Sequence, residues 1–188
     1  MDFSIGKAIL KAREQRYLVK TAMIEGGGTL IEMASIMPGS DKQHAGLAQI
    51  FEDGLRELTV HLNLGVNAIM DDCAGYYALA RSPLDGVTCK RLAVALEEQY
   101  PWNRLLDIDC FVLGNAVTRS SMGFPERKCL VCGDVHSECI YEKRHPIELV
   151  SSSAHQLIDS YFLSSTTLVE PRLKENAEMS SPNLILRL

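Results

Sequence analysis

The chain carries two hydrophobic periodicities, one typical of helices and one typical of strands. Apolar residues at helical spacing predict helices over residues 3–24, 45–62, 87–100 and 147–161. Shorter apolar runs bounded by turn residues predict strands over residues 29–37, 66–70, 75–80, 105–113 and through Val117 and Thr118. Helices and strands are mixed rather than strictly alternating. The pattern therefore predicts an α+β fold, with a mixed or antiparallel sheet of about five short strands and flanking helices.

The lengths of these segments also predict the domain organisation. The 188 residues, 46% of them hydrophobic, are enough for one core, so we expect a single domain over residues 1–163. A cysteine-rich segment, residues 127–146, belongs to this domain. Residues 164–188 are polar and contain two prolines, which predicts a loosely attached tail. The strand at 105–113 is expected to turn at Gly114–Asn115 into a hairpin, and the strands around Asp71–Cys73 are expected to form another.

Charge and hydropathy exclude several classes of function. A net charge of -5 and a pI near 5.5 argue against a nucleic-acid binder, which needs a basic surface. No apolar run is long enough to span a bilayer, and the first residues lack the pattern of a secretory signal. We therefore expect a cytoplasmic protein without a membrane partner. The six cysteines are then not expected to form disulfides, because the cytosol keeps thiols reduced.

Two carboxylates, Asp107 and Asp109, lie one residue apart within an apolar strand. Side chains of a strand alternate between faces, so both aspartates are expected on one face and Ile108 on the other. An uncompensated buried charge is costly, which favours a bound cation, and Mg²⁺ held by carboxylates is typical of phosphoryl transfer. The alternative is a strand end at which the aspartates face water or pair with arginines.

A second group of candidate ligands follows this strand. Cys129 and Cys132 are separated by two residues, and Cys139 and His145 follow, with His136 as a competing ligand. Thiolates and imidazole suit tetrahedral Zn²⁺. The alternative is a set of reduced thiols packed under a helix.

Several basic residues are candidate phosphate contacts. The turn at residues 38–42 joins a predicted strand to a predicted helix, and its Lys42 could help to form a phosphate cradle. Lys90, Arg119 and Arg127 flank the aspartate strand, and each could equally be a surface charge. His44, His61 and His155 fall in helical segments without ligand-like partners, so they are expected to be ordinary histidines.

Read together, these segments resemble the family of apo-citrate lyase phosphoribosyl-dephospho-CoA transferases, also called holo-citrate lyase synthases. The resemblance covers roughly residues 10–160 and rests on these motifs: Pro38–Gly39 with Lys42, Lys90, Arg104–Asp109, Thr118–Arg119, and Arg127–Cys132 with Cys139 and His145. Asn103 departs from the pattern, because a glycine usually stands there. The Asp-Ile-Asp strand also resembles that of nucleotidyltransferases, an analogy that does not fix the fold.

The resemblance implies a reaction and its partners. The family transfers the 2'-(5''-phosphoribosyl)-3'-dephospho-CoA group from its triphosphate precursor, triphosphoribosyl-dephospho-CoA, to a serine of the acyl-carrier (γ) subunit of citrate lyase, and releases pyrophosphate. Asp107 and Asp109 would then hold Mg²⁺, and the phosphate contacts would be Lys42, Lys90, Arg104, Arg119 and Arg127. The Cys/His group would form a closed, structural zinc site.

Two other functions fit the same residues. One is a non-enzymatic protein-interaction module stabilised by zinc, in which the aspartates are structural. The other is the same chemistry on a different carrier, such as that of malonate decarboxylase.

Overall fold

A computed structural model describes residues 3–178, with residues 165–178 described only as helix backbone. The elements follow in this order: α1 (Phe3–Met23), β1 (Thr29–Ser35), α2 (Ala45–Leu62), β2 (Gly65–Asp72), β3 (Gly75–Ser82), α3 (Gly86–Gln99), the 3₁₀ helix η1 (Pro101–Leu105), β4 (Leu106–Val112), β5 (Asn115–Val117), the 3₁₀ helix η2 (Ser120–Met122), α4 (His136–Tyr141) and α5 (Ile147–Glu178). The four long helices and the five strands agree with the predicted α+β class. The short helix α4 was not predicted.

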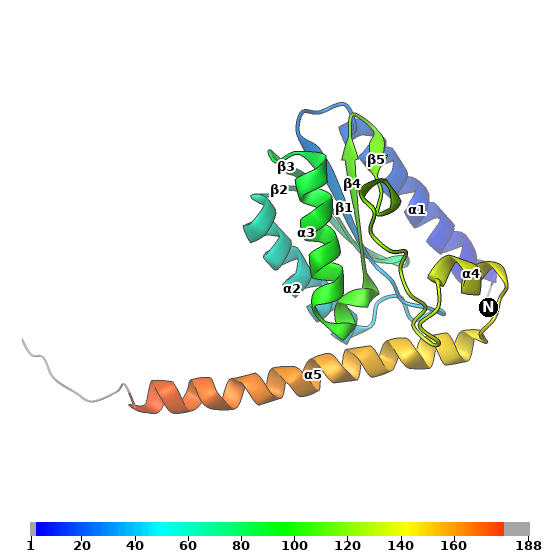
Figure 1. The fold of residues 1–188 in the computed structure, drawn as a ribbon. Helices are drawn as coiled ribbons and strands as arrows, with labels where there is room; N and C mark the ends of the chain where they lie inside the picture. Colours follow the sequence, from blue (N-terminus) through cyan, green and yellow to red (C-terminus); the bar gives the residue numbers. More distant parts are fainter. Residues whose placement is uncertain (1–2, 179–188) are drawn as a thin grey trace, which may run out of the picture.

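The five strands form one antiparallel sheet in the order β2-β3-β1-β4-β5 (Figure 1). The hairpins β2–β3 and β4–β5 confirm the two predicted turns. The central strand β1 pairs with strands that come much later in the chain, so that Met33 lies opposite both Ala78 of β3 and Ile108 of β4. The aspartate strand β4 therefore lies next to the centre of the sheet.

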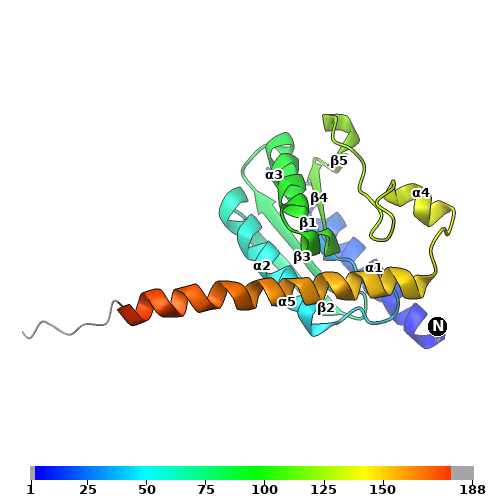
Figure 2. The same cartoon turned by 60° about the horizontal axis from the view of Figure 1, so that its bottom comes forward.

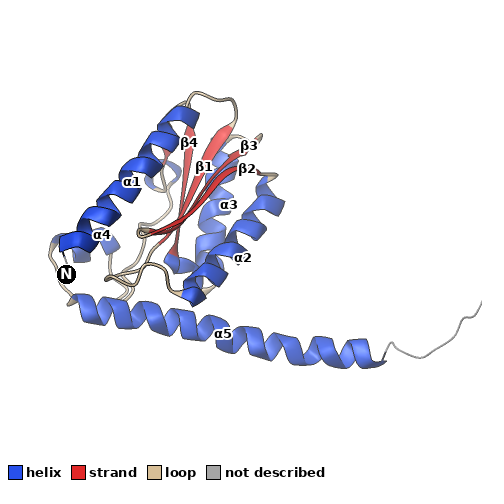
Figure 3. Cartoon of the chain, turned by 180° about the vertical axis from the view of Figure 1, so that it is seen from behind, coloured by secondary structure: helices blue, strands red, loops and turns tan. Residues whose placement is uncertain are grey.

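The two faces of the sheet are covered by different helices. The helices α2 and α3 lie over one face (Figure 1). They cover the apolar side chains of β1 and β4, including Leu106, Ile108 and Cys110. On the other face lies α1, seen from behind in Figure 3, over a smaller cluster around Leu30 and Tyr77. Burial along β4 alternates residue by residue, as expected for a strand with one fully covered face. The odd-numbered positions, which carry the aspartates, face the less covered side.

The last described helix, α5, crosses one end of the sheet and packs on α2 and η1 (Figure 2). Its Ala154 and Ile158 are buried, and the Tyr161 hydroxyl donates a hydrogen bond of 2.6 Å to Asp53 of α2. The helix continues past residue 164, so the predicted boundary does not coincide with its end. A loosely attached tail stays a prediction, and residues 179–188 lie outside the described residues. In the described part of the chain, none of the helices has the length and hydrophobicity needed to traverse a bilayer.

Candidate active site on strand β4

The two aspartates lie on the same face of β4, as predicted. The side chains of Asp107 and Asp109 are 45% and 49% exposed, whereas the intervening Ile108 is fully buried. In the pairing of β4 with β1, Asp109 lies opposite Glu32. Residues directly opposite in an antiparallel pair share a face, so a third carboxylate belongs to this surface. Glu32 accepts hydrogen bonds of 2.8 Å from Lys20 and from the Tyr77 hydroxyl.

Each aspartate also has a cationic partner. Arg127 Nη1 lies 2.7 Å from Asp107 Oδ1, and Lys90 Nζ lies 3.3 Å from Asp109 Oδ1. Asp107 therefore pairs with an arginine, as the alternative interpretation of the sequence expected. About half of each aspartate side chain nevertheless stays exposed. Burial, with a smaller contribution from the negative charge of Asp109, raises the pKa of Asp107, although Arg127 opposes this shift. Asp107 therefore holds its negative charge less firmly than an ordinary aspartate.

Along one edge of β4, side chains bind backbone groups that no neighbouring strand pairs. The short strand β5 pairs only with Cys110–Val112, so the backbone of the aspartate segment has no strand partner on that side. Lys90 donates to the Ile108 carbonyl at 2.6 Å, and Glu97 accepts from the Ile108 N–H at 2.8 Å. Arg127 donates to the Leu106 carbonyl at 2.6 Å. These three side chains fix the backbone on which both aspartates stand.

Sequence reasoning missed Glu97, whose side chain is almost fully buried. Its second carboxylate oxygen pairs with Arg119, and Arg119 also lies 2.6 Å from the more exposed Glu98. A glutamate in an amphipathic helix usually faces water, so the sequence gives little reason to expect that Glu97 is buried. Its position three residues before the predicted end of the helix is the only signal, and it is a weak one. Glu97 connects the β4 backbone to an arginine of the adjacent pocket.

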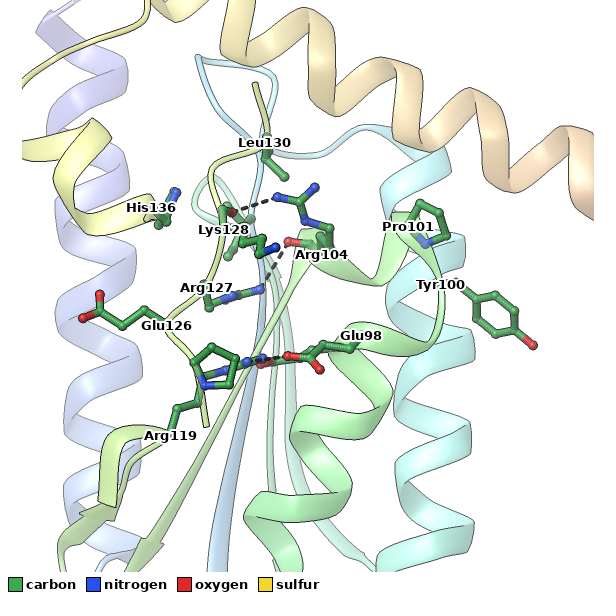
Figure 4. A pocket seen from close by; sticks show the side chains of 13 residues that line it. Glu98, Tyr100, Pro101, Arg104, Arg119, Glu126, Arg127, Lys128, Leu130 and His136 are labelled. Atoms are coloured by element: carbon green, nitrogen blue, oxygen red, sulfur yellow. Dashed lines mark hydrogen bonds and ion pairs between the residues drawn. The ribbon is translucent and has the colours of Figure 1, made fainter. Parts of the chain in front are cut away.

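That pocket has a volume of about 580 Å³ and lies beside β4 and the C-terminal end of α3. Figure 4 shows Arg119, Arg127 and Arg104 one after another along it. Three of the five predicted phosphate contacts thus line one cavity, together with Lys128 and His136. The lining also includes Glu97, Glu98 and Glu126, which offset part of this positive charge. Guanidinium groups gathered in a partly enclosed cavity still suit the binding of a polyphosphate. Lys90 lies beside this group, at Asp109.

Lys42 lies apart from the pocket lining. Its amino group donates a hydrogen bond to the Met37 carbonyl, and burial, together with the nearby Arg13, lowers its pKa. The backbone of the Lys42 loop lies beside Gly75 of the β2–β3 hairpin. A role of Lys42 in binding phosphate stays a prediction.

The predicted Cys/His group comes together in the fold. One ligand atom from each of Cys129, Cys132, Cys139 and His145 lies within 4.8 Å of the others. The Sγ atoms of Cys132 and Cys139 are 3.5 Å apart, and His145 Nε2 is 3.3 Å from Cys132 Sγ. Three thiols and one imidazole converging in this way are compatible with tetrahedral Zn²⁺. We call these four residues the Cys/His cluster.

The competing ligand His136 is not part of the Cys/His cluster and lines the pocket instead. Burial and the nearby Arg127 and Arg104 lower its pKa, so its imidazole is neutral at neutral pH. The cluster and the pocket are directly connected, because Arg104 donates to the carbonyls of Lys128 and Cys129 at 2.8 and 2.9 Å. The cluster therefore anchors the segment that carries Arg127.

Comparison with known proteins identifies the family to which the chain belongs. Residues 6–161 match the family model described as apo-citrate lyase phosphoribosyl-dephospho-CoA transferase. The chain belongs to this transferase family. The matched range includes both aspartates, the pocket arginines and the Cys/His cluster. The family resemblance inferred from the motifs is confirmed.

Individual relatives are similar at modest identity. The chain is 25% identical over 163 residues to a probable apo-citrate lyase phosphoribosyl-dephospho-CoA transferase of Streptococcus pyogenes, covering 82% of this chain and 85% of that protein. It is 26% identical over 149 residues to the transferase of Citrobacter koseri, covering 74% and 80%. It is 30% identical over 162 residues to the protein CitXG of Haemophilus influenzae. That match covers 82% of this chain but only 35% of CitXG, so the chain spans about a third of that longer protein.

Proposed function

We propose that this protein transfers the 2'-(5''-phosphoribosyl)-3'-dephospho-CoA group from its triphosphate precursor to a serine of the citrate lyase acyl-carrier (γ) subunit and releases pyrophosphate. Family membership supports the reaction class. The observation that carries the proposal is the pair Asp107 and Asp109 on a rigid strand beside a pocket lined by three arginines. Carboxylates next to clustered cations are what a metal-assisted reaction of a polyphosphate requires.

In this proposal the triphosphate lies along Arg104, Arg119 and Arg127. The serine hydroxyl of the carrier attacks the α-phosphorus, the bond to the bridging oxygen of pyrophosphate breaks, and the serine proton passes to solvent or to a nearby base. Negative charge builds on the phosphoryl oxygens and on the leaving pyrophosphate. Preorganised guanidinium groups stabilise that charge without having to reorient during the reaction.

The aspartates fit Mg²⁺ in their chemistry. Asp107 and Asp109 present carboxylate oxygens on one face, about half exposed, which are the donors that Mg²⁺ prefers, and each retains access to solvent for the remaining water ligands. When bound, Mg²⁺ would neutralise the phosphate charge and orient the reacting phosphoryl group. Lys90 and Arg127 position the two carboxylates through the contacts described above.

The Cys/His cluster is proposed to hold a structural Zn²⁺. Four protein ligands leave no open coordination position, which is typical of a structural site rather than a catalytic one. The ion would fix the loop that follows η2, and with it Arg127, next to Asp107.

The proposal is tested by incubating the purified protein with Mg²⁺, triphosphoribosyl-dephospho-CoA and the apo-carrier, and measuring the mass of the carrier. We expect the carrier to gain the mass of the prosthetic group with the wild type. Asp107→Asn should abolish this gain, whereas Asp159→Asn, a change at an exposed aspartate of α5, should leave it unchanged.

The other outcomes separate the alternatives. No gain with the wild type on a competent citrate lyase carrier, but a gain with the malonate decarboxylase carrier, would transfer the reaction to that partner. No gain with either carrier, together with stoichiometric zinc and no binding of the precursor, would favour an interaction module. A full gain with Asp107→Asn would refute the metal role of the aspartates.

A further inference from the structure

A second group of metal-binding side chains lies at the other end of the molecule from β5, where α5 meets the loop before α2. One ligand atom each of Asp41, His44 and His155 lies within 4.8 Å of the others. Within the described residues, only this group and the Cys/His cluster bring three or more such ligands so close together. The ligands come from two segments more than a hundred residues apart in the chain, so the fold, not a local motif, assembles them.

His155 is already oriented as a metal ligand. Its Nδ1 lies 2.8 Å from the carbonyl oxygen of Ser151, one turn earlier in α5. A carbonyl only accepts, so Nδ1 carries the proton, and in the neutral ring Nε2 presents a lone pair. Histidines that bind metals usually donate their other ring N–H to a carbonyl or carboxylate in this way.

The lone pair of His155 faces a carboxylate. Nε2 is 3.9 Å from Asp41 Oδ2, too far for a hydrogen bond. A metal ion placed between the two atoms would be held by both, because the imidazole nitrogen offers a lone pair and the carboxylate a negative charge. The Asp41 side chain is 58% exposed and that of His155 is 41% exposed, so an ion can reach both from solvent.

His44 completes the group from the N-terminal end of α2. Its ring packs edge-on against that of His155, with centroids 5.4 Å apart, and its Nδ1 accepts a hydrogen bond of 3.1 Å from the Gly46 N–H. A metal ion can bind His44 through Nδ1 in place of that hydrogen bond, or through Nε2 once the proton moves to Nδ1. Either route exchanges one helix-capping contact for a coordination bond.

We infer that Asp41, His44 and His155 form a Zn²⁺ site that connects the loop before α2 to α5. Two imidazoles and one carboxylate are a donor set that suits Zn²⁺, with water completing the tetrahedron. The site is separate from the aspartates of β4 and from the Cys/His cluster. Because α5 packs on α2 and η1, an ion bound here stabilises the attachment of this helix.

The experiment is a titration of metal-free protein with Zn²⁺ by calorimetry and with Co²⁺ by absorption spectroscopy. We expect the wild type to bind one more equivalent than His155→Ala or Asp41→Asn. His61→Ala, a change at an exposed histidine of α2 outside this group, should bind as much as the wild type. In the Co²⁺ titration, the extra equivalent should add d–d bands without sulfur-to-metal charge transfer, which only thiolate ligands give.

A structural readout accompanies the titration. Zn²⁺ should raise the melting temperature of the wild type more than that of Asp41→Asn, whose exposed, isosteric change leaves the fold intact. Equal stoichiometry for the wild type and both variants would overturn the inference. So would an extra equivalent that binds only at millimolar Zn²⁺ and leaves the melting temperature unchanged, because that describes an adventitious ion only.

Discussion

Replacing Glu97 by glutamine tests whether this buried side chain holds the aspartate strand in place. The carboxylate is 3% exposed, accepts from the Ile108 N–H at 2.8 Å and pairs with Arg119. Glutamine has the same shape and its amide oxygen can still accept from Ile108. The change therefore removes chiefly the charge that Arg119 pairs with.

The magnitude follows from these contacts. Removing one partner of a buried ion pair costs about 3–5 kcal/mol when the other charge is left alone. Arg119 keeps Glu98 at 2.6 Å, so we expect Glu97→Gln to lower the free energy of unfolding by about 2 kcal/mol. Glu97→Ala also leaves the Ile108 N–H without its acceptor and should cost about 1–3 kcal/mol more. Glu98→Gln, the matched control, breaks an exposed pair to the same arginine and should cost under about 1 kcal/mol.

The assay is urea unfolding followed by the fluorescence of Trp102, the only tryptophan in the sequence. The same variants are then compared in the carrier-labelling reaction as the Mg²⁺ concentration is varied. Because Ile108 lies between the aspartates, Glu97→Gln should raise the Mg²⁺ concentration needed for half-maximal activity, and Glu98→Gln should not. If both variants unfold and respond to Mg²⁺ alike, Glu97 does not position the site.

Three further predictions concern Asp107 and the 3₁₀ helix η1, which precedes its strand. Since burial raises the pKa of Asp107, protonation should compete with Mg²⁺ at a higher pH than for an ordinary aspartate, so half-saturating Mg²⁺ should rise as the pH falls toward that pKa. A Mg²⁺ requirement that begins to rise only where an ordinary aspartate protonates, at about pH 4, would contradict this. The raised pKa also means that protonation of Asp107 favours the folded state, so Asp107→Asn should stabilise the metal-free protein at neutral pH. Asn103 is buried, and its side chain donates a hydrogen bond of 2.7 Å to the Leu96 carbonyl. Asn103→Ala should cost about 1–2 kcal/mol of stability in urea unfolding without altering the Mg²⁺ requirement, and an unchanged midpoint would show that this hydrogen bond contributes nothing.

Much of the fold follows from local patterns. The helix predicted over residues 45–62 is α2, residue for residue, because its apolar positions recur at the helical period. The alternation along residues 105–113 correctly placed both aspartates on one face, since that property depends on the strand period alone. The spacing of the cysteines predicted a cluster that the fold assembles.

The tertiary structure decided what depends on contacts between distant segments. The order of the strands sets Glu32 opposite Asp109, and no local periodicity encodes that register. Glu97 looked like a surface residue, and it is buried because the short β5 leaves the edge of β4 for side chains to fill. In the same way, His44 and His155 had no partners in their own helices. They meet Asp41 because α5 crosses the end of the sheet and packs on α2. Secondary structure depends on residues that are close in the chain, whereas packing brings residues together whatever their separation in the chain.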